Sequence, residues 1–195
     1  MELRAAFDRL KQAHLAGALS YAQRIDMLTR LDTAVRNCRE ELVAACNADF
    51  GRRSRVETLA ADVMVTLDEI KYARKNLSRW MRPQRRSVNI TFKPARGEIR
   101  YAPLGVVGVV APWNYPFQLA VIPLVNAIAA GNRVMVKPSE FTPQVSALLE
   151  KMLSAVFSSD EVAVVQGDAA VGAAFTQLPF DHLIFTGSTA VGKHV

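Results

Sequence analysis

Between residues 105 and 185, short apolar runs alternate with longer segments whose apolar residues have helical spacing. The run from Gly105 to Ala111 is almost entirely apolar, which is typical of a strand buried on both faces of a sheet. Strands that alternate with helices predict a parallel sheet with right-handed crossover connections. The predicted strands are 105–111, 133–136, 162–165 and 182–185, and the predicted helices are 116–130, 142–157 and 168–177. The chain is therefore expected to have an α/β fold.

The residues that precede this region have the pattern of helices. One helix is predicted over residues 2–18, and a longer one begins after Ser20 and ends near Gly51. An S-x-x-E pattern that starts at Ser54 is the signature of a capping box. In this motif, the side chain of the serine and that of the glutamate each accept a hydrogen bond from the other residue's backbone N–H at the start of a helix. It predicts a third helix, which Pro83 ends.

After this third helix, polar and apolar residues alternate over 87–92 and 98–101, with a turn at 94–97 between them. This pattern predicts a β-hairpin arm. The formal net charge of +6 is concentrated between Arg79 and Arg100. Nucleic-acid binding is one interpretation of such a cluster, but few aromatic residues are interleaved with it and no known nucleic-acid module is present. A solvated face or a subunit contact is the favoured interpretation.

Composition indicates an ordinary globular protein, with 50% hydrophobic and 22% charged residues. We expect no membrane span, because no apolar run approaches the roughly 20 residues that a span requires. We also expect no signal peptide. Cys38 and Cys46 lie on the predicted buried stripe of the second helix, which favours core packing over a nucleophile or a metal ligand. Two such cysteines point to a reducing cytoplasm.

Polar residues follow the predicted strands at their carboxyl ends. Asn114 follows the first strand, Lys137 and Glu140 the second, Asp168 the third and Ser188 the fourth. Ligands of parallel sheets bind at this edge. The set suits a dinucleotide, with phosphate at Ser188 and ribose hydroxyls at Lys137 and Glu140. Alternatively, Asn114 orders a turn and Lys137 forms a surface ion pair with Glu140.

The turn after the fourth predicted strand, residues 185–192, reads FTGSTAVG. A turn from strand to helix built on Gly, Ser and Thr leaves backbone N–H groups that suit a phosphate. Gly187 has no Cβ, so a ligand can approach its backbone closely. The spacing is G-x-x-x-x-G, which is neither the usual dinucleotide fingerprint nor a P-loop. A glycine turn before a capped helix is the alternative interpretation.

Three motifs in this order and spacing resemble the NAD(P)-dependent aldehyde dehydrogenase superfamily: PWNYP at 112–116, KPSE at 137–140 and FTGST at 185–189. Residues 49–54 with 57–58, and residues 79–83, resemble its coniferyl aldehyde dehydrogenase branch. The resemblance implies an incomplete Rossmann-like sheet, preceded by N-terminal helices and a β-hairpin arm. It also implies oxidation of an aldehyde, coniferyl or another aromatic one, to the carboxylic acid.

The resemblance implies roles for individual residues. Asn114 would be catalytic, donating its side-chain amide to the carbonyl oxygen of the substrate as negative charge develops there. Lys137 and Glu140 would bind the adenosine ribose, and Glu140 favours NAD, with NADP as the alternative. Gly187 and Ser188 would contact the pyrophosphate. The full set of implied cofactor-binding residues is Val110, Ala111, Pro112, Trp113, Lys137, Ser139, Glu140, Gly167, Gly172, Phe185, Thr186, Gly187, Ser188 and Val191.

The chemistry of this superfamily needs a cysteine nucleophile and a glutamate base, which follow the 185–192 turn in the family pattern. We therefore expect the chain to be an N-terminal fragment of a parent protein and inactive by itself. Its expected parts are an N-terminal helical part (1–86), an oligomerisation arm (87–102) and an NAD-binding part (103–195). The expected parent is a cytoplasmic homodimer or homotetramer that takes a small-molecule aldehyde, with no metal, nucleic acid or membrane partner. The alternative is a non-catalytic nucleotide-binding or assembly module.

Overall fold

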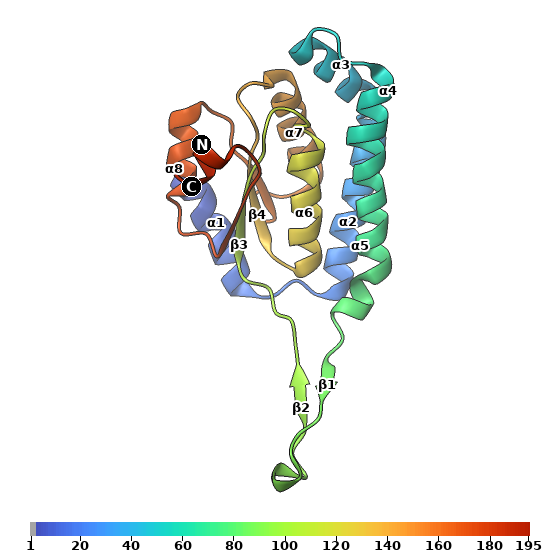
Figure 1. The fold of residues 1–195 in the computed structure, drawn as a ribbon, viewed down its shortest axis with the longest axis vertical. Coiled ribbons are helices and arrows are strands. Elements are labelled where there is room, and N and C mark those ends of the chain that lie inside the picture. The colour runs from blue at the N-terminus through green and yellow to red at the C-terminus, as the bar shows by residue number, and fades with distance from the viewer. Residues whose placement is uncertain (1–2) are drawn as a thin grey trace.

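A four-stranded parallel sheet lies at the centre of the molecule in the computed structural model, which describes residues 3–195 (Figure 1). Its strands are β3 (Val106–Val110), β4 (Arg133–Lys137), β5 (Val162–Val164) and β6 (His182–Phe185), in the spatial order β5-β4-β3-β6. All three strand pairs are parallel. The predicted strands and the α/β fold class are therefore confirmed.

Helices cover both faces of this sheet. On one face, α6 (Gln118–Ala130) and α7 (Pro143–Val156) pack against the strands. On the other face, α1 (Leu3–Ala16) packs against β3, β4 and β5, and α8 (Ala169–Thr176) contributes Phe175 to the same small core. α9 (Thr189–Gly192) follows β6. The helices predicted between the strands are all present, with ends shifted by one or two residues.

A further layer of helices packs against α6 and α7 (Figure 1). It contains α2 (Tyr21–Asn37), α3 (Arg39–Phe50), α4 (Arg55–Glu57), the π-helix η1 (Thr58–Met64) and α5 (Val65–Trp80). The prediction of one continuous helix from Ser20 to Gly51 is wrong, because the backbone of Cys38 (φ −87°, ψ 1°) separates α2 from α3. Both predicted ends are confirmed: Ser20 caps α2 and the left-handed Gly51 ends α3.

The capping box predicted at Ser54 does not form. The Ser54 hydroxyl accepts a hydrogen bond from the backbone N–H of Val56, but Glu57 turns toward the guanidinium of Arg53, at 3.9 Å, instead of reaching back to the cap. After α4 the chain widens into the π-helix η1. The predicted inward positions of this region are confirmed as buried at Val63, Ile70 and Leu77, whereas Leu67 and Met81 are half-buried against the core.

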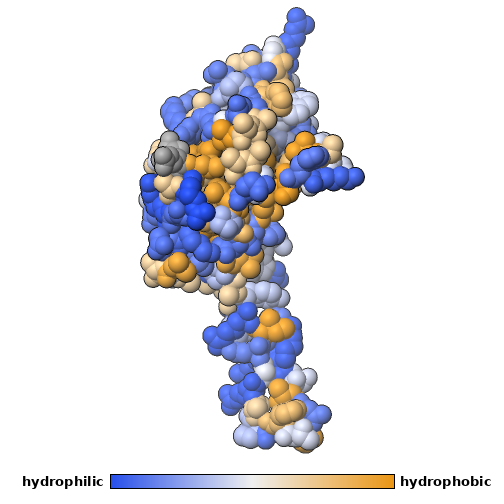
Figure 2. Space-filling model, turned by 90° about the vertical axis from the view of Figure 1, so that its left-hand side faces the viewer, coloured by the Kyte–Doolittle hydropathy of each residue, from blue (hydrophilic) through white to orange (hydrophobic). Residues whose placement is uncertain are grey.

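The arm is a two-stranded antiparallel ribbon that projects from the body (Figure 1). Its strands are β1 (Gln84–Arg86) and β2 (Gly97–Ile99), with a 3₁₀ turn, η2 (Ile90–Phe92), near the tip. The prediction of a strand over 87–92 is wrong, because the Asn89 side chain accepts a hydrogen bond from Thr91 N–H and turns the chain. Figure 2 shows hydrophilic residues over most of the arm, interrupted by a few hydrophobic ones.

Candidate functional site

The carboxyl ends of three neighbouring strands lie at one level. Val110 at the end of β3 is in register with Lys137 at the end of β4 and with Phe185 at the end of β6. Chain order reverses at β3, because the next strand in sequence lies on one side of it and the last strand on the other. Such a reversal is where open parallel sheets bind ligands. The structure therefore brings the predicted residues 110, 137 and 185 to one edge.

Lys137 is a buried cation at this edge, with 3% of its surface exposed. Its Nζ donates to Glu140 Oε2 at 2.8 Å and to the Pro138 carbonyl oxygen at 3.0 Å. Burial raises the pKa of the Glu140 carboxyl. The hydrogen bond from Lys137 and its positive charge lower this pKa by more than burial raises it, so the pKa lies below its ordinary value. The pair exists as the sequence suggested, yet its cation is not on the surface. Its third ammonium hydrogen and the second oxygen of Glu140 remain for a ligand.

A small pocket of about 180 Å³ adjoins this pair. Its lining joins the loop after β4 to the loop after β5 and consists of Pro138, Ser139, Glu140, Pro143, Ser146, Gln166 and Gly167. Gly167 has a φ of 151°, and a Cβ there would meet the Val171 side chain. A Cβ on Gly172 would lie 3.8 Å from Lys137 Cε, so α8 passes close to the buried lysine. The predicted residues 137, 139, 140, 167 and 172 thus lie together.

The turn after β6 has the predicted strand-to-helix form. Ser188 caps α9, and its hydroxyl accepts a hydrogen bond from Val191 N–H at 3.3 Å. The space that a Cβ on Gly187 would occupy is filled by the Phe185 ring. The lack of a Cβ at Gly187 therefore also makes room for Phe185, and the approach of a ligand to the Gly187 backbone stays a prediction. Thr186 is half-buried, whereas Gly187, Ser188 and Val191 are exposed.

The loop after β3 carries the remaining predicted residues. Ala111 is buried and Pro112 is half-buried, while Trp113 is 54% exposed and Asn114 is also exposed. Within residues 3–195 the side-chain amide of Asn114 makes no hydrogen bond, so its donors are free for a ligand. Its backbone carbonyl oxygen accepts a hydrogen bond from Arg53 Nη1 at 2.8 Å.

Sequence reasoning did not identify Arg53 or its partner Asp62 as site residues. Asp62 is fully buried and forms an ion pair of 2.9 Å with Arg53. One signal was present: Asp62 lies four residues after Thr58 and four before Thr66, on the inward side of the helix. An acid on a buried stripe needs a partner, but nothing in the sequence says which cation supplies it.

The described residues contain no metal site and no membrane-spanning helix. No group of three or more His, Cys, Asp or Glu residues within 3–195 is placed to hold a metal ion. In that same part of the chain, no helix is both long and apolar enough to cross a membrane. A larger pocket, of about 680 Å³, lies at the base of the arm and is lined in part by Trp80, Tyr101 and Asn132. It is separate from the strand-end edge.

Comparison with known proteins agrees with this geometry. A model of the aldehyde dehydrogenase family matches residues 2–195. The sequence is 49% identical over 195 residues to a probable coniferyl aldehyde dehydrogenase of Pseudomonas aeruginosa, and 45% identical over 195 residues to a coniferyl aldehyde dehydrogenase of Pseudomonas sp. strain HR199. All of this chain is covered, but it spans only 41% and 40% of the lengths of these relatives.

Solved structures give the same result. The substrate-bound structure of Staphylococcus aureus AldH has a TM-score of 0.95 and 32% identity, covering 99% of this chain and 42% of that one. An NAD⁺ complex of an aldehyde dehydrogenase from Bacillus cereus has a TM-score of 0.86 and 26% identity, covering 99% of this chain and 40% of that one.

Proposed function

Because the chain belongs to the aldehyde dehydrogenase family, we propose that it is the cofactor-binding part of a parent enzyme that oxidises an aldehyde to the carboxylic acid with NAD. The observation that carries this proposal is the buried ammonium of Lys137 at the carboxyl end of β4, paired with the more exposed carboxylate of Glu140. Removing an ammonium from water is unfavourable, and a sheet does not need a lysine at this position to fold. A site that binds hydroxyl groups at the ligand edge accounts for it.

The residues present fit a nicotinamide dinucleotide. Lys137 has a donor to spare and Glu140 an acceptor to spare, which matches the two hydroxyls of a ribose. The Glu140 carboxylate repels a 2′-phosphate, which favours NAD over NADP. Ser188 and the backbone of the 186–188 turn would contact the pyrophosphate, and Val191 would pack beside the adenine. When bound, this cofactor supplies the acceptor for the hydride that the aldehyde loses.

Asn114 is the residue of this chain that would act on the substrate. Its side-chain amide donates a hydrogen bond to the carbonyl oxygen of the aldehyde, and this bond strengthens as negative charge develops on that oxygen. Neither cysteine of the chain serves as the nucleophile, because both thiols are buried in the helical core. The nucleophile and the general base would belong to the remainder of the parent enzyme, so the 195 residues would be inactive without it.

The substrate we propose is an aromatic aldehyde of the coniferyl type. Support comes from relatives at 49% and 45% identity that carry this name and align with the whole chain. The parent would be a cytoplasmic homodimer or homotetramer assembled through the arm, whose exposed Ile90 and Phe92 suit a subunit contact. The alternative, a nucleotide-binding module without catalysis, predicts cofactor binding with no aldehyde oxidation in the parent.

Steady-state kinetics of the parent enzyme with NAD and coniferyl aldehyde test this proposal. Asn114→Ala should lower kcat by about 100-fold and leave the dissociation constant of NAD unchanged, because the side-chain amide that it removes stabilises only the developing oxyanion. Asn126→Ala, which removes an exposed amide from α6, is the matched control and should behave as wild type. Wild-type turnover in Asn114→Ala would exclude the assigned role, and NADH production by the 195 residues on their own would exclude a missing nucleophile.

A further inference from the structure

An ion pair with no catalytic assignment lies beneath the loop that carries Asn114. The side chains of Arg53 and Asp62 are 4% and 0% exposed, and Arg53 Nη2 lies 2.9 Å from Asp62 Oδ2. Burying two charges costs free energy that their attraction does not fully recover, so such a pair contributes little to stability compared with apolar residues of the same size. Separating the two charges would leave each of them buried without a partner, which is strongly unfavourable.

The Arg53–Asp62 pair forms a hydrogen bond at each end of the segment 114–118. Arg53 Nη1 donates to the backbone carbonyl oxygen of Asn114 at 2.8 Å, and its guanidinium stacks over the Tyr115 ring at 4.7 Å from the centroid. Asp62 Oδ1 accepts from the backbone N–H of Gln118, the first residue of α6, at 3.0 Å. One ion pair therefore determines where the 114–118 segment lies relative to the helical layer.

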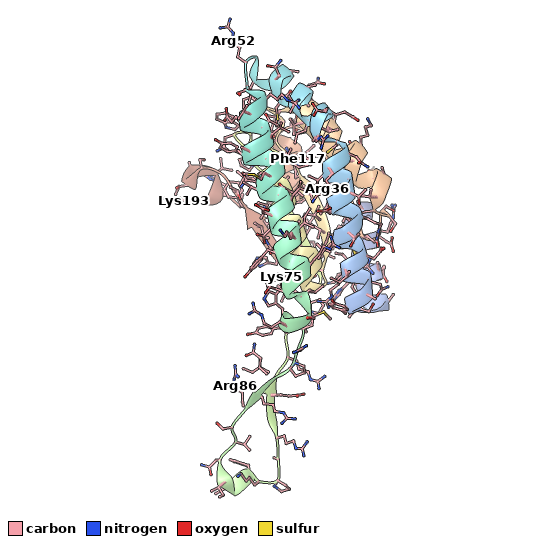
Figure 3. The ribbon with its side chains drawn as sticks, turned by 90° about the vertical axis from the view of Figure 1, so that its right-hand side faces the viewer. Arg36, Arg52, Lys75, Arg86, Phe117 and Lys193 are labelled. Atoms are coloured by element: carbon pink, nitrogen blue, oxygen red, sulfur yellow. The ribbon has the colours of Figure 1, made fainter. Side chains whose placement is uncertain are left out.

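Local structure places both charges with little freedom to move. The guanidinium of Arg53 also lies over the Phe50 ring, with 4.8 Å from the guanidinium carbon to the ring centroid. Asp62 belongs to the π-helix η1, and π-helical segments within α-helices are frequent at functional sites. The neighbouring Arg52, by contrast, extends into solvent at the end of the molecule (Figure 3). Two adjacent arginines thus have opposite environments.

We propose that Arg53 and Asp62 are positioning residues that fix the backbone of Asn114, so that its side-chain amide is held where the carbonyl oxygen of the substrate binds; this rests on the function proposed above for Asn114. The arginine is specific to the task because its planar fork reaches the carboxylate and the carbonyl at once, which one ammonium cannot do with the same geometry. The Lys137–Glu140 pair lies at the end of β4 and in the loop after it, and shares no hydrogen bond with Arg53 within residues 3–195. Binding of the ribose by Lys137 and Glu140 should therefore be independent of Arg53 and Asp62.

Kinetics of Arg53→Gln, Arg53→Lys and Asp62→Asn in the parent enzyme test the proposal, with Arg52→Gln as the matched control. Because displacements of about 1 Å at a reacting group cost about 100-fold in rate, we expect Arg53→Gln to lower kcat by about 10- to 100-fold. Arg53→Lys should retain more activity than Arg53→Gln, since its charge still pairs with Asp62. The dissociation constant of NAD should change far less than kcat in all variants, because Lys137 and Glu140 keep their pairing, and Arg52→Gln should match wild type throughout.

A second measurement keeps this proposal separate from the proposed function. Hydrogen exchange of the parent, followed in peptides that cover residues 112–119, should be faster in Arg53→Gln than in Arg52→Gln, while peptides from β4 exchange at equal rates in both. Equal exchange rates in 112–119 would overturn the positioning role, whether or not the wild type oxidises an aldehyde. Absence of aldehyde oxidation by the wild-type parent would instead refute the proposed function. Wild-type kcat in Arg53→Gln, or a cofactor affinity that falls in step with kcat, also overturns it. If Arg53→Gln does not fold, the comparison of Arg53→Lys with Arg52→Gln decides.

Discussion

At the scale of single residues, environment separates side chains of the same type. Lys137 is buried and paired at the strand-end edge, whereas Lys75 lies exposed on α5 (Figure 3). Arg53 and Arg52 differ in the same way. A buried charge requires a compensating partner, so the side chains of Lys137 and Arg53 are held in place by their hydrogen bonds, whereas among residues 3–195 those of Lys75 and Arg52 are not. The functional assignments rest on these differences.

The two cysteines give a prediction at this scale. Burial raises the pKa of both thiols to about 11. The negative charge of Glu41 raises the pKa of Cys38 as well, and that of Asp62 raises the pKa of Cys46. At about pH 8 only about one thiol in a thousand would be the reactive thiolate, and access to it is blocked. A chromogenic disulfide reagent should therefore leave both thiols unmodified in the folded chain and modify both in denaturant. Rapid modification of the folded chain would contradict the core assignment.

At the scale of elements, Asp181 ties α1 to the sheet. Its carboxylate accepts hydrogen bonds from Lys11 Nζ at 2.7 Å and from the backbone N–H of Val106 at 2.7 Å. Burial raises the pKa of Asp181, but Lys11 and the Val106 N–H lower it more, so this pKa lies below its ordinary value in the folded state. This contribution to stability is present above the unfolded-state pKa and disappears as the pH falls through the folded-state pKa.

Asp181→Asn should accordingly lower the free energy of unfolding by about 1 kcal/mol at about pH 7, the scale of a charge-assisted hydrogen bond that remains partly solvated. The difference from wild type should be constant down to about pH 5 and shrink at about pH 3. Urea unfolding of both proteins at these pH values measures it, with Asp8→Asn, in the exposed pair with Arg4, as control. A difference that grows toward acid pH would show that the sign is wrong.

The elements that the sequence predicted correctly are those whose signal is local. Apolar runs such as 105–111 specify buried strands, and Gly51 ends a helix by its own conformation. The sequence analysis did not predict the break at Cys38, the π-helix at 58–64 or the 3₁₀ turn after Asn89. At Asn89 the alternating pattern favoured a strand, but the hydrogen bond from Thr91 N–H to the Asn89 side chain turns the chain instead. Ser54 shows the same limit: its capping pattern is present, yet Glu57 turns to Arg53 instead.

The candidate site divides in the same way. Lys137 and Glu140 were predictable because the strand order fixes which edge they occupy, and because three residues of separation let them pair. Arg53 was not predictable, since its carbonyl partner is 61 residues away in sequence and no local pattern links the two. The packing of the Phe185 ring against Gly187 was not predicted, because it depends on the direction in which that ring points.

At the scale of the whole molecule, the arm proposed for assembly and the edge proposed for cofactor binding lie at opposite ends of the sheet. The arm leaves the body between α5 and the amino end of β3, whereas the Lys137–Glu140 pair lies at the carboxyl end of β4 (Figure 1). Assembly through the arm and cofactor binding at the edge are therefore expected to be independent. The chain spans 41% of a relative that it matches throughout, so both functions are proposed for the parent enzyme.

Titration of NAD into the parent enzyme by calorimetry tests the central claim most directly. The account predicts saturable binding that Lys137→Met weakens by about 10- to 100-fold, because the variant removes charged hydrogen bonds to the cofactor. Lys75→Met, which removes an exposed ammonium from α5, should bind NAD with wild-type affinity. Equal affinity in wild type and Lys137→Met would show that the strand-end edge is not the cofactor site.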